Sequence, residues 1–132
     1  MREIQVEITN QCPLNCVLCS SKELRMCTER GKVTLQNLTE LITRIPGQKR
    51  VFLTGGEPLS CYDLEEICGQ LSVLPDVELG LYTCGVREKD GQLYSVDEVF
   101  AKKLFDQGIR ECYLSLYGYD ANSHIRFSSI LF

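Results

Sequence analysis

"RVFLTGGEP", residues 50–58, is the stretch that decides the fold. Its first five residues are nearly all apolar, which is typical of a short strand covered on both faces in a parallel sheet. Two glycines and a proline then turn the chain away from the strand. We therefore expect residues 50–54 to form an inner strand of an α/β domain.

The flanking sequence repeats this pattern of strand and helix. Residues 3–9 alternate polar and apolar side chains as a strand does, and "VELGLYT" and "ECYLSLYG" are predicted strands over 77–83 and 111–118. Apolar residues at helical spacing predict helices from near Thr34 to Ile45, over 63–74 and over 96–107.

The last of these helices has predicted caps at both ends. Ser95 with Glu98 matches a capping box, and Gly108 stands where a C′ glycine belongs. The order βαβαβαβ predicts a parallel sheet with right-handed crossovers. Loops over 10–33 and 83–94 are the two long irregular places, and we expect chemistry in such loops.

Composition narrows the class of protein. The chain has 132 residues, 44% of them apolar, and a net charge of −4, which argues against binding a nucleic-acid backbone. No apolar stretch approaches the length of a membrane span, and the N-terminus lacks the apolar region of a signal peptide. Eight cysteines in such a chain indicate metal ligands or core thiols, so we expect a cytoplasmic location.

The loop after the first strand carries three closely spaced thiols. In "QCPLNCVLCSS", residues 11–21, three residues separate Cys12 from Cys16 and two residues separate Cys16 from Cys19. Three thiolates on a [4Fe–4S] cluster would leave one iron open to another ligand, as a catalytic zinc keeps one open position. Two alternatives stay open at this point: a zinc site completed by Cys27, and core thiols that are clustered by chance.

The turn after the second strand carries a second pattern. In "TGGEP", residues 54–58, Gly55 and Gly56 let the backbone approach a ligand closely, and Glu57 offers a carboxylate to a positively charged group. The alternative is an ordinary turn between a strand and a helix.

Together the C-x3-C-x2-C loop and the Gly-Gly-Glu turn resemble the radical S-adenosylmethionine (SAM) superfamily, and the resemblance runs from about residue 4 to about residue 124. It implies a partial (βα) barrel of the TIM-like type, with about three βα units plus a fourth parallel strand. It also implies that the three loop cysteines ligate a [4Fe–4S] cluster. By the same resemblance, the Gly-Gly-Glu turn holds the amino group of SAM, and Ser115 on the fourth strand reaches its ribose or carboxylate.

The activity implied by this resemblance is reductive cleavage of SAM to a 5′-deoxyadenosyl radical that abstracts a substrate hydrogen. A flavodoxin- or ferredoxin-type reductant would supply the electron, and a peptide is the substrate class that the loop and fourth strand favour. Two other interpretations remain: a non-catalytic iron–sulfur or zinc module, and one half of a split enzyme.

The remaining expectations concern the end of the chain and its other thiols. The family barrel has six βα units, so residues 1–132 are expected to be a single radical SAM core domain truncated on its C-terminal side, with no useful helix signal in "HIRFSSILF". We expect His124 to be a surface residue, and the role of Cys84 is open. Small apolar packing is expected for three further cysteines: Cys61, Cys68 and Cys112.

Overall fold

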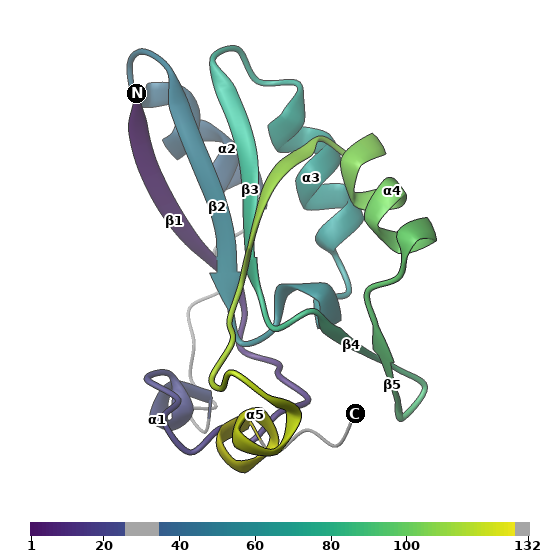
Figure 1. Ribbon diagram of the computed structural model, residues 1–132. Helices are drawn as coiled ribbons and strands as arrows, with labels where there is room; N and C mark the ends of the chain where they lie inside the picture. The colour runs from purple at the N-terminus through teal and green to yellow at the C-terminus, as the bar shows by residue number, and fades with distance from the viewer. Residues whose placement is uncertain (26–34, 129–132) are drawn as a thin grey trace.

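The protein is a parallel α/β fold, seen in a computed structural model that describes residues 1–25 and 35–128 (Figure 1). Four strands form one sheet in the order β1-β2-β3-β6, and each neighbouring pair in that order is parallel. Their bounds are Arg2–Thr9 for β1, Lys49–Gly55 for β2, Val77–Thr83 for β3 and Ile109–Leu114 for β6. The predicted partial barrel is therefore confirmed.

Three helices pack against one face of this sheet and form the core with it. They are α2 (Leu35–Arg44), α3 (Leu64–Ser72) and α4 (Glu98–Asp106). Alternate residues of β2 and β3 meet apolar residues of all three helices, and the fully or nearly fully buried members include Ile42, Val51, Leu53, Cys68, Leu71, Leu79, Leu81 and Leu104. None of the helices in the described ranges is long and apolar enough to cross a membrane.

The other face of β2 is covered too, as the apolar sequence of the strand predicts, and aromatic side chains cover it. Phe52 is fully buried, although α2, α3 and α4 lie on the opposite side of the strand. Its ring lies 4.9 Å from that of Tyr82 and 5.3 Å from that of Tyr113, and the two tyrosines stack on each other. A side chain at Gly80 would overlap the Phe52 ring, so the glycine leaves the space that this ring fills. Aromatic side chains of neighbouring strands thus replace a second layer of helices.

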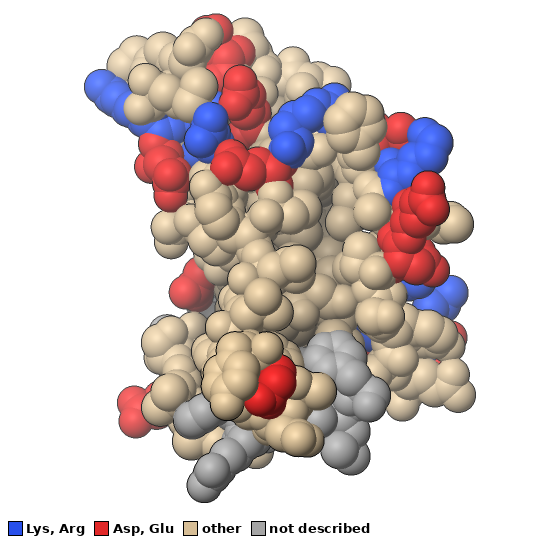
Figure 2. Space-filling view, viewed as in Figure 1, with Lys and Arg blue, Asp and Glu red and all other residues tan. Residues whose placement is uncertain are grey.

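Charged side chains gather toward the amino ends of the strands. Arg50 forms ion pairs with Glu78 at 3.7 Å and with Glu111 at 3.3 Å across three strands. Figure 2 shows the band of charges across the upper part of the molecule, whereas the surface near the carboxyl ends of the strands is mostly uncharged in this view. The polar groups of the functional site, described below, therefore lie away from the charged end of the sheet.

A β-hairpin occupies most of the loop predicted at 83–94. Strands β4 (Val86–Lys89) and β5 (Gln92–Ser95) pair antiparallel, apart from the main sheet. The guanidinium of Arg87 lies 4.1 Å from the ring centre of Phe100 and fastens the hairpin to α4.

Element ends differ from the predictions in two places, and a third prediction is confirmed. Helix α4 begins after Asp97, whose carboxylate accepts the N–H of Phe100, so Asp97 and not Ser95 is the N-cap. Strand β6 ends at Leu114, four residues before its predicted end. The predicted glycine cap is confirmed, since Gly108 follows the C-cap of α4 with a φ of +100°.

Short helices complete the chain, and one of them corrects a prediction. Besides α1 (Lys22–Arg25) and the 3-10 turn η1 (Pro58–Ser60), a helix α5 spans Ala121–Ser128, where no useful helix was expected. Its first turn is fixed by Asp120, whose carboxylate accepts both the N–H and the hydroxyl of Ser123. Cys68 is buried as expected and Cys61 is half-buried, but Cys112 is exposed because β6 is the edge strand.

Adjacent residues of α2 give a matched test of this core. Ile42 is fully buried, whereas Leu41 is 59% exposed although it shares the apolar spacing of the helix. We expect Ile42→Ala to lower the free energy of unfolding by about 2–5 kcal/mol, because it leaves a cavity beneath the sheet. Leu41→Ala should change it by less than about 0.5 kcal/mol. Urea denaturation of both variants measures the difference, and equal losses would contradict this placement of α2.

Candidate functional site

The loops at the carboxyl ends of the parallel strands form the site. The cysteine loop follows β1, the Gly-Gly-Glu turn follows β2, and residues 83–85 follow β3 (Figure 1). Carboxyl ends of parallel strands meet at one edge of a sheet, which is where α/β folds bind their ligands. The two patterns singled out from the sequence therefore lie at the same edge.

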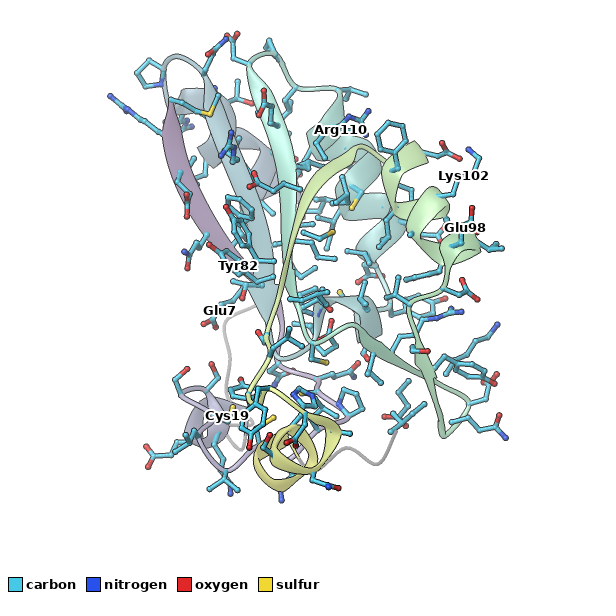
Figure 3. All side chains as sticks on the ribbon, in the orientation of Figure 1. Glu7, Cys19, Tyr82, Glu98, Lys102 and Arg110 are labelled. Atoms are coloured by element: carbon cyan, nitrogen blue, oxygen red, sulfur yellow. The ribbon has the colours of Figure 1, made fainter. Side chains whose placement is uncertain are left out.

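The three loop cysteines pack together in a small apolar cluster. Cys16 is 8% exposed and packs with Leu14 and Val86, and Cys12 and Cys19 pack against this group. Figure 3 shows Cys19 between the α1 segment and α5, below the ends of the strands. The structure thus brings the three predicted ligands together and shields one of them almost completely from water.

Two backbone hydrogen bonds tie the cysteine loop to the Gly-Gly-Glu turn. The N–H of Gly56 donates to the carbonyl of Thr9 at 2.8 Å, and the N–H of Glu57 donates to the carbonyl of Gln11 at 2.7 Å. A Cβ at Gly55 would overlap the carbonyl oxygen of Thr9, and one at Gly56 that of Gln11. The two glycines are therefore needed for the close approach of these two loops, a role that the sequence alone did not indicate.

Glu57 is buried and joins the ends of two strands. Only 2% of its surface is exposed. One carboxylate oxygen, Oε1, accepts the N–H of Leu59 at 3.0 Å and the hydroxyl of Thr83 at 2.5 Å, and Oε2 accepts the N–H of Cys84 at 2.8 Å. A buried carboxylate is tolerated only when it is hydrogen-bonded in this way. Glu57 is thus more than an ordinary turn residue, because it fixes the end of β3 to the turn after β2.

Cys84 is a fourth thiol at the site. It packs against the same apolar cluster as the loop cysteines, and its Sγ lies 3.8 Å from the carbonyl oxygen of Val86. Burial, followed by the negative charge of Glu57 and a hydrogen bond with that carboxylate, raises the pKa of the Cys84 thiol far above its usual range. The thiol is therefore protonated at neutral pH and acts as a weak hydrogen-bond donor.

His124 is buried, which corrects the expectation of a surface histidine. It is 6% exposed, and its Nδ1 accepts the backbone N–H of Tyr117 at 3.2 Å. Burial, and then the negative charges of the Cys16 and Cys19 thiolates, raise the pKa of Tyr117 above its usual range. Helix α5, which the sequence did not predict, brings His124 to this position.

Ser115 lies just beyond β6 and is half-buried. Its backbone N–H donates to the carbonyl of Thr83 at 2.9 Å, which holds this segment beside the end of β3. The predicted contact of its hydroxyl with SAM stays a prediction, and Cys27 lies outside the described residues.

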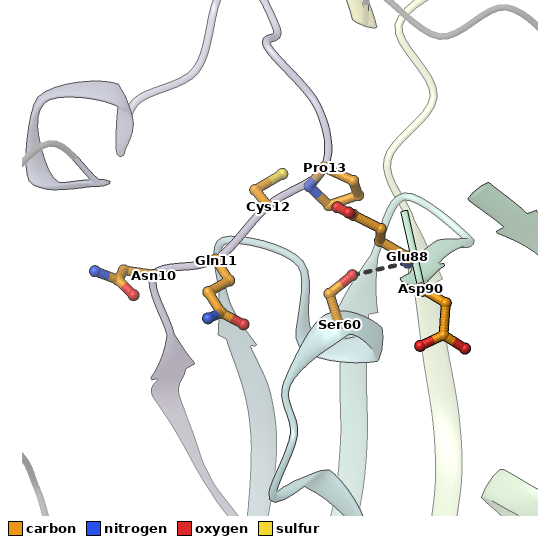
Figure 4. Close-up of a pocket in the computed structure, with 7 residues that line it drawn as sticks. All are labelled: Asn10, Gln11, Cys12, Pro13, Ser60, Glu88 and Asp90. Carbon is orange, nitrogen blue, oxygen red and sulfur yellow. Dashed lines mark hydrogen bonds between the residues drawn. The ribbon is translucent and has the colours of Figure 1, made fainter. Parts of the chain in front are cut away.

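A pocket of about 650 Å³ borders the cysteine loop (Figure 4). Its lining is polar and comes from the start of this loop, from η1 and from the β4–β5 hairpin: Asn10, Gln11, Cys12, Pro13, Ser60, Glu88 and Asp90. The N–H of Glu88 donates to the hydroxyl of Ser60 at 3.2 Å and closes one wall. Among the loop cysteines, Cys12 is the one that faces this pocket.

The donor set at the site fits an iron–sulfur cluster. In residues 1–25 and 35–128, no three His, Cys, Asp or Glu side chains are grouped as a single metal ion requires. Thiolates on a [4Fe–4S] cluster bind different irons and need not meet at one point. Three thiols packed in one apolar group match that donor set.

Comparison with known proteins places the chain in a family. The model of the radical SAM superfamily matches residues 6–128, so the chain belongs to the radical SAM superfamily. A GTP 3',8-cyclase of Pseudomonas putida is 27% identical over 121 residues, which cover 90% of this chain and 34% of that protein. A GTP 3',8-cyclase of Pseudomonas fluorescens is 30% identical over 121 residues, covering 89% and 34%.

The chain spans about a third of the length of the curated relatives it matches. A solved structure, the selenomethionine form of BtrN in an open conformation, superposes with a TM-score of 0.66 at 23% identity. The match covers 91% of this chain and 51% of that one. This structural likeness supports the fold.

The hydrogen bonds of Glu57 give a test of its structural role. Glu57→Ala leaves two buried N–H groups and the Thr83 hydroxyl without their acceptor, so we expect the free energy of unfolding to fall by at least about 1–3 kcal/mol. Glu57→Gln keeps one carbonyl oxygen and should lose less. Urea denaturation compares them with Glu66→Ala, an exposed glutamate of α3 that should change little. A Glu57→Ala chain as stable as its parent would contradict the role.

Proposed function

We propose that Cys12, Cys16 and Cys19 hold a [4Fe–4S] cluster and that SAM binds at its open iron. The observation that carries this proposal is the packing of the three loop thiols into one apolar group that is tied by backbone hydrogen bonds to the Gly-Gly-Glu turn. Membership of the radical SAM superfamily supports it. When bound, the cluster supplies the electron that cleaves SAM, and the resulting 5′-deoxyadenosyl radical removes a hydrogen atom from the substrate.

One apolar residue of the cysteine loop and one of β4 shield Cys16 from water. Leu14 and Val86 are 5% and 3% exposed, and they pack directly against Cys16. A dry surrounding protects a reactive radical from side reactions, and it strengthens every electrostatic contact inside the site. Cys12, which faces the polar pocket, is the ligand nearest to solvent on that side.

Glu57 is the residue that we propose for the amino group of SAM. A carboxylate offers about four acceptor positions; three accept the N–H of Leu59, the hydroxyl of Thr83 and the N–H of Cys84, and the Cys84 thiol is a weak donor that competes for the fourth. An ammonium group would form a charge-assisted hydrogen bond with the remaining position. Gly55 and Gly56 hold Glu57 at a fixed place next to the cysteine loop, and Ser115 is the candidate contact for the ribose or carboxylate of SAM.

Partner and substrate follow as further proposals. A reductant of the flavodoxin or ferredoxin class would deliver the electron to the cluster. The relatives are named for a reaction of GTP, which makes GTP one substrate to test. A peptide is the other, since the cysteine loop and the end of the fourth strand favour it.

Anaerobic reconstitution with iron and sulfide tests this function. We expect the parent chain and Cys68→Ala to assemble a [4Fe–4S] cluster with the absorption of such clusters, and Cys16→Ala to lose most of its iron. Cys68 is the matched control, because it is fully buried in the core away from the loop. Adding SAM should change the spectrum of the reduced cluster in the parent.

Three outcomes would contradict the proposal. Equal loss of iron in Cys16→Ala and Cys68→Ala would mean that the loop thiols are not the ligands. Tetrahedral zinc bound by four thiolates would favour a zinc module. A cluster whose spectrum ignores SAM would favour a non-catalytic iron–sulfur protein.

A further inference from the structure

Within the described residues, the hydroxyl of Thr83 makes the shortest hydrogen bond to the Glu57 carboxylate. Thr83 is the last residue of β3 and is 5% exposed. Its Oγ1 donates to Oε1 of Glu57 at 2.5 Å and accepts the N–H of Gly85 at 2.9 Å. Because the amide of Gly85 fills an acceptor position on Oγ1, the hydroxyl proton is directed at the carboxylate. The direction of this hydrogen bond is therefore fixed by the backbone.

The two oxygens of Glu57 are unequally occupied. Oε1 accepts two donors, the N–H of Leu59 and the hydroxyl of Thr83, whereas Oε2 accepts the backbone N–H of Cys84. Each carboxylate oxygen has about two acceptor positions, so Oε1 is filled and Oε2 keeps one. The other group near the carboxylate is the Cys84 thiol, a weak donor that an ammonium can displace.

We propose that Thr83 is a positioning residue, which fills Oε1 of Glu57 and so presents Oε2 to the ammonium of SAM. This inference rests on the proposed function. Thr83 is well suited to it, because a β-branched side chain at a strand end has few rotamers and its hydroxyl is held from two sides. The backbone of Thr83 also accepts the N–H of Ser115, so the same residue fixes a second candidate SAM contact.

Loss of the Thr83 hydroxyl should weaken the binding of SAM and leave the assembly of the cluster unchanged. In Thr83→Val, Oε1 keeps one donor, and the carboxylate can turn so that either oxygen meets the Cys84 amide. A hydrogen bond to a charged group contributes about 1.5–3 kcal/mol, so we expect the Kd for SAM to rise by about tenfold or more. The cysteine loop contacts the turn through Gly56 and Glu57 backbone groups, which the substitution leaves in place.

The experiment is a SAM titration of reconstituted chains, followed by the change in the cluster spectrum. Thr83→Val and Thr83→Ala both lack the hydroxyl, and Thr83→Ser keeps it. Leu81→Ala is the matched control, because Leu81 lies in the same strand, is fully buried and faces the helices. We expect native iron content throughout, weak SAM binding in Thr83→Val and Thr83→Ala, and near-native Kd values in Thr83→Ser and Leu81→Ala.

The outcomes separate the two proposals. Native SAM affinity in Thr83→Val and Thr83→Ala overturns the positioning role while the proposed function stands. Equal weakening in Leu81→Ala also overturns it, since lost stability would then explain the effect. A parent chain that assembles no cluster or binds no SAM overturns the proposed function, and the positioning role with it.

Discussion

The buried carboxylate of Glu57 is the interaction on which the carboxyl edge of this sheet depends. It lies where a charge is costly, and three donors from two separate chain segments compensate for that cost. If the turn after β2 and the end of β3 moved apart, the charge would lose two of its three donors, the hydroxyl of Thr83 and the N–H of Cys84. Separating the two segments would thus leave a buried charge with too few hydrogen-bond donors. The free-energy cost of that state is larger than the net stabilisation from any one of these hydrogen bonds.

Apolar spacing was sufficient to predict the layers of the fold. Val51 and Leu53 on β2, and Leu79 and Leu81 on β3, alternate in sequence and face the helices in the structure. This pattern is informative because one face of each strand is buried, so that a shift of one residue would expose its whole apolar set. Cys12, Cys16 and Cys19 pack in one apolar group in the structure because few residues separate them along the loop, and their binding of a cluster stays a prediction.

Features that depend on contacts across the fold could not be predicted in the same way. Phe52 fills the space that Gly80 leaves open and is covered by Tyr82 and Tyr113, contacts that no local sequence pattern indicates. The hairpin did carry a local signal: Asp90-Gly91 between alternating residues favours a tight turn, and both have positive φ. His124 is buried because α5 folds back below the ends of the strands, where its ring accepts the N–H of Tyr117 (Figure 1). Nothing in the sequence around Thr83 indicates its hydrogen bond to Glu57, because the two residues lie in different segments of the chain.

Backbone hydrogen bonds hold the cysteine loop at a fixed place beside the Gly-Gly-Glu turn. From Thr9 and Gln11 the chain enters the cysteine loop, and their carbonyls accept the N–H groups of Gly56 and Glu57. No side-chain rotamer intervenes in this connection, and any Cβ at the two positions before Glu57 would push the loops apart. A ligand that bridges an iron and a carboxylate needs such a fixed spacing, because small displacements in a site cost much of its preorganised electrostatic stabilisation. The Gly-Gly-Glu order thus has a physical explanation: the glycines set the spacing of the two loops, and under the proposed function Glu57 meets SAM at that spacing.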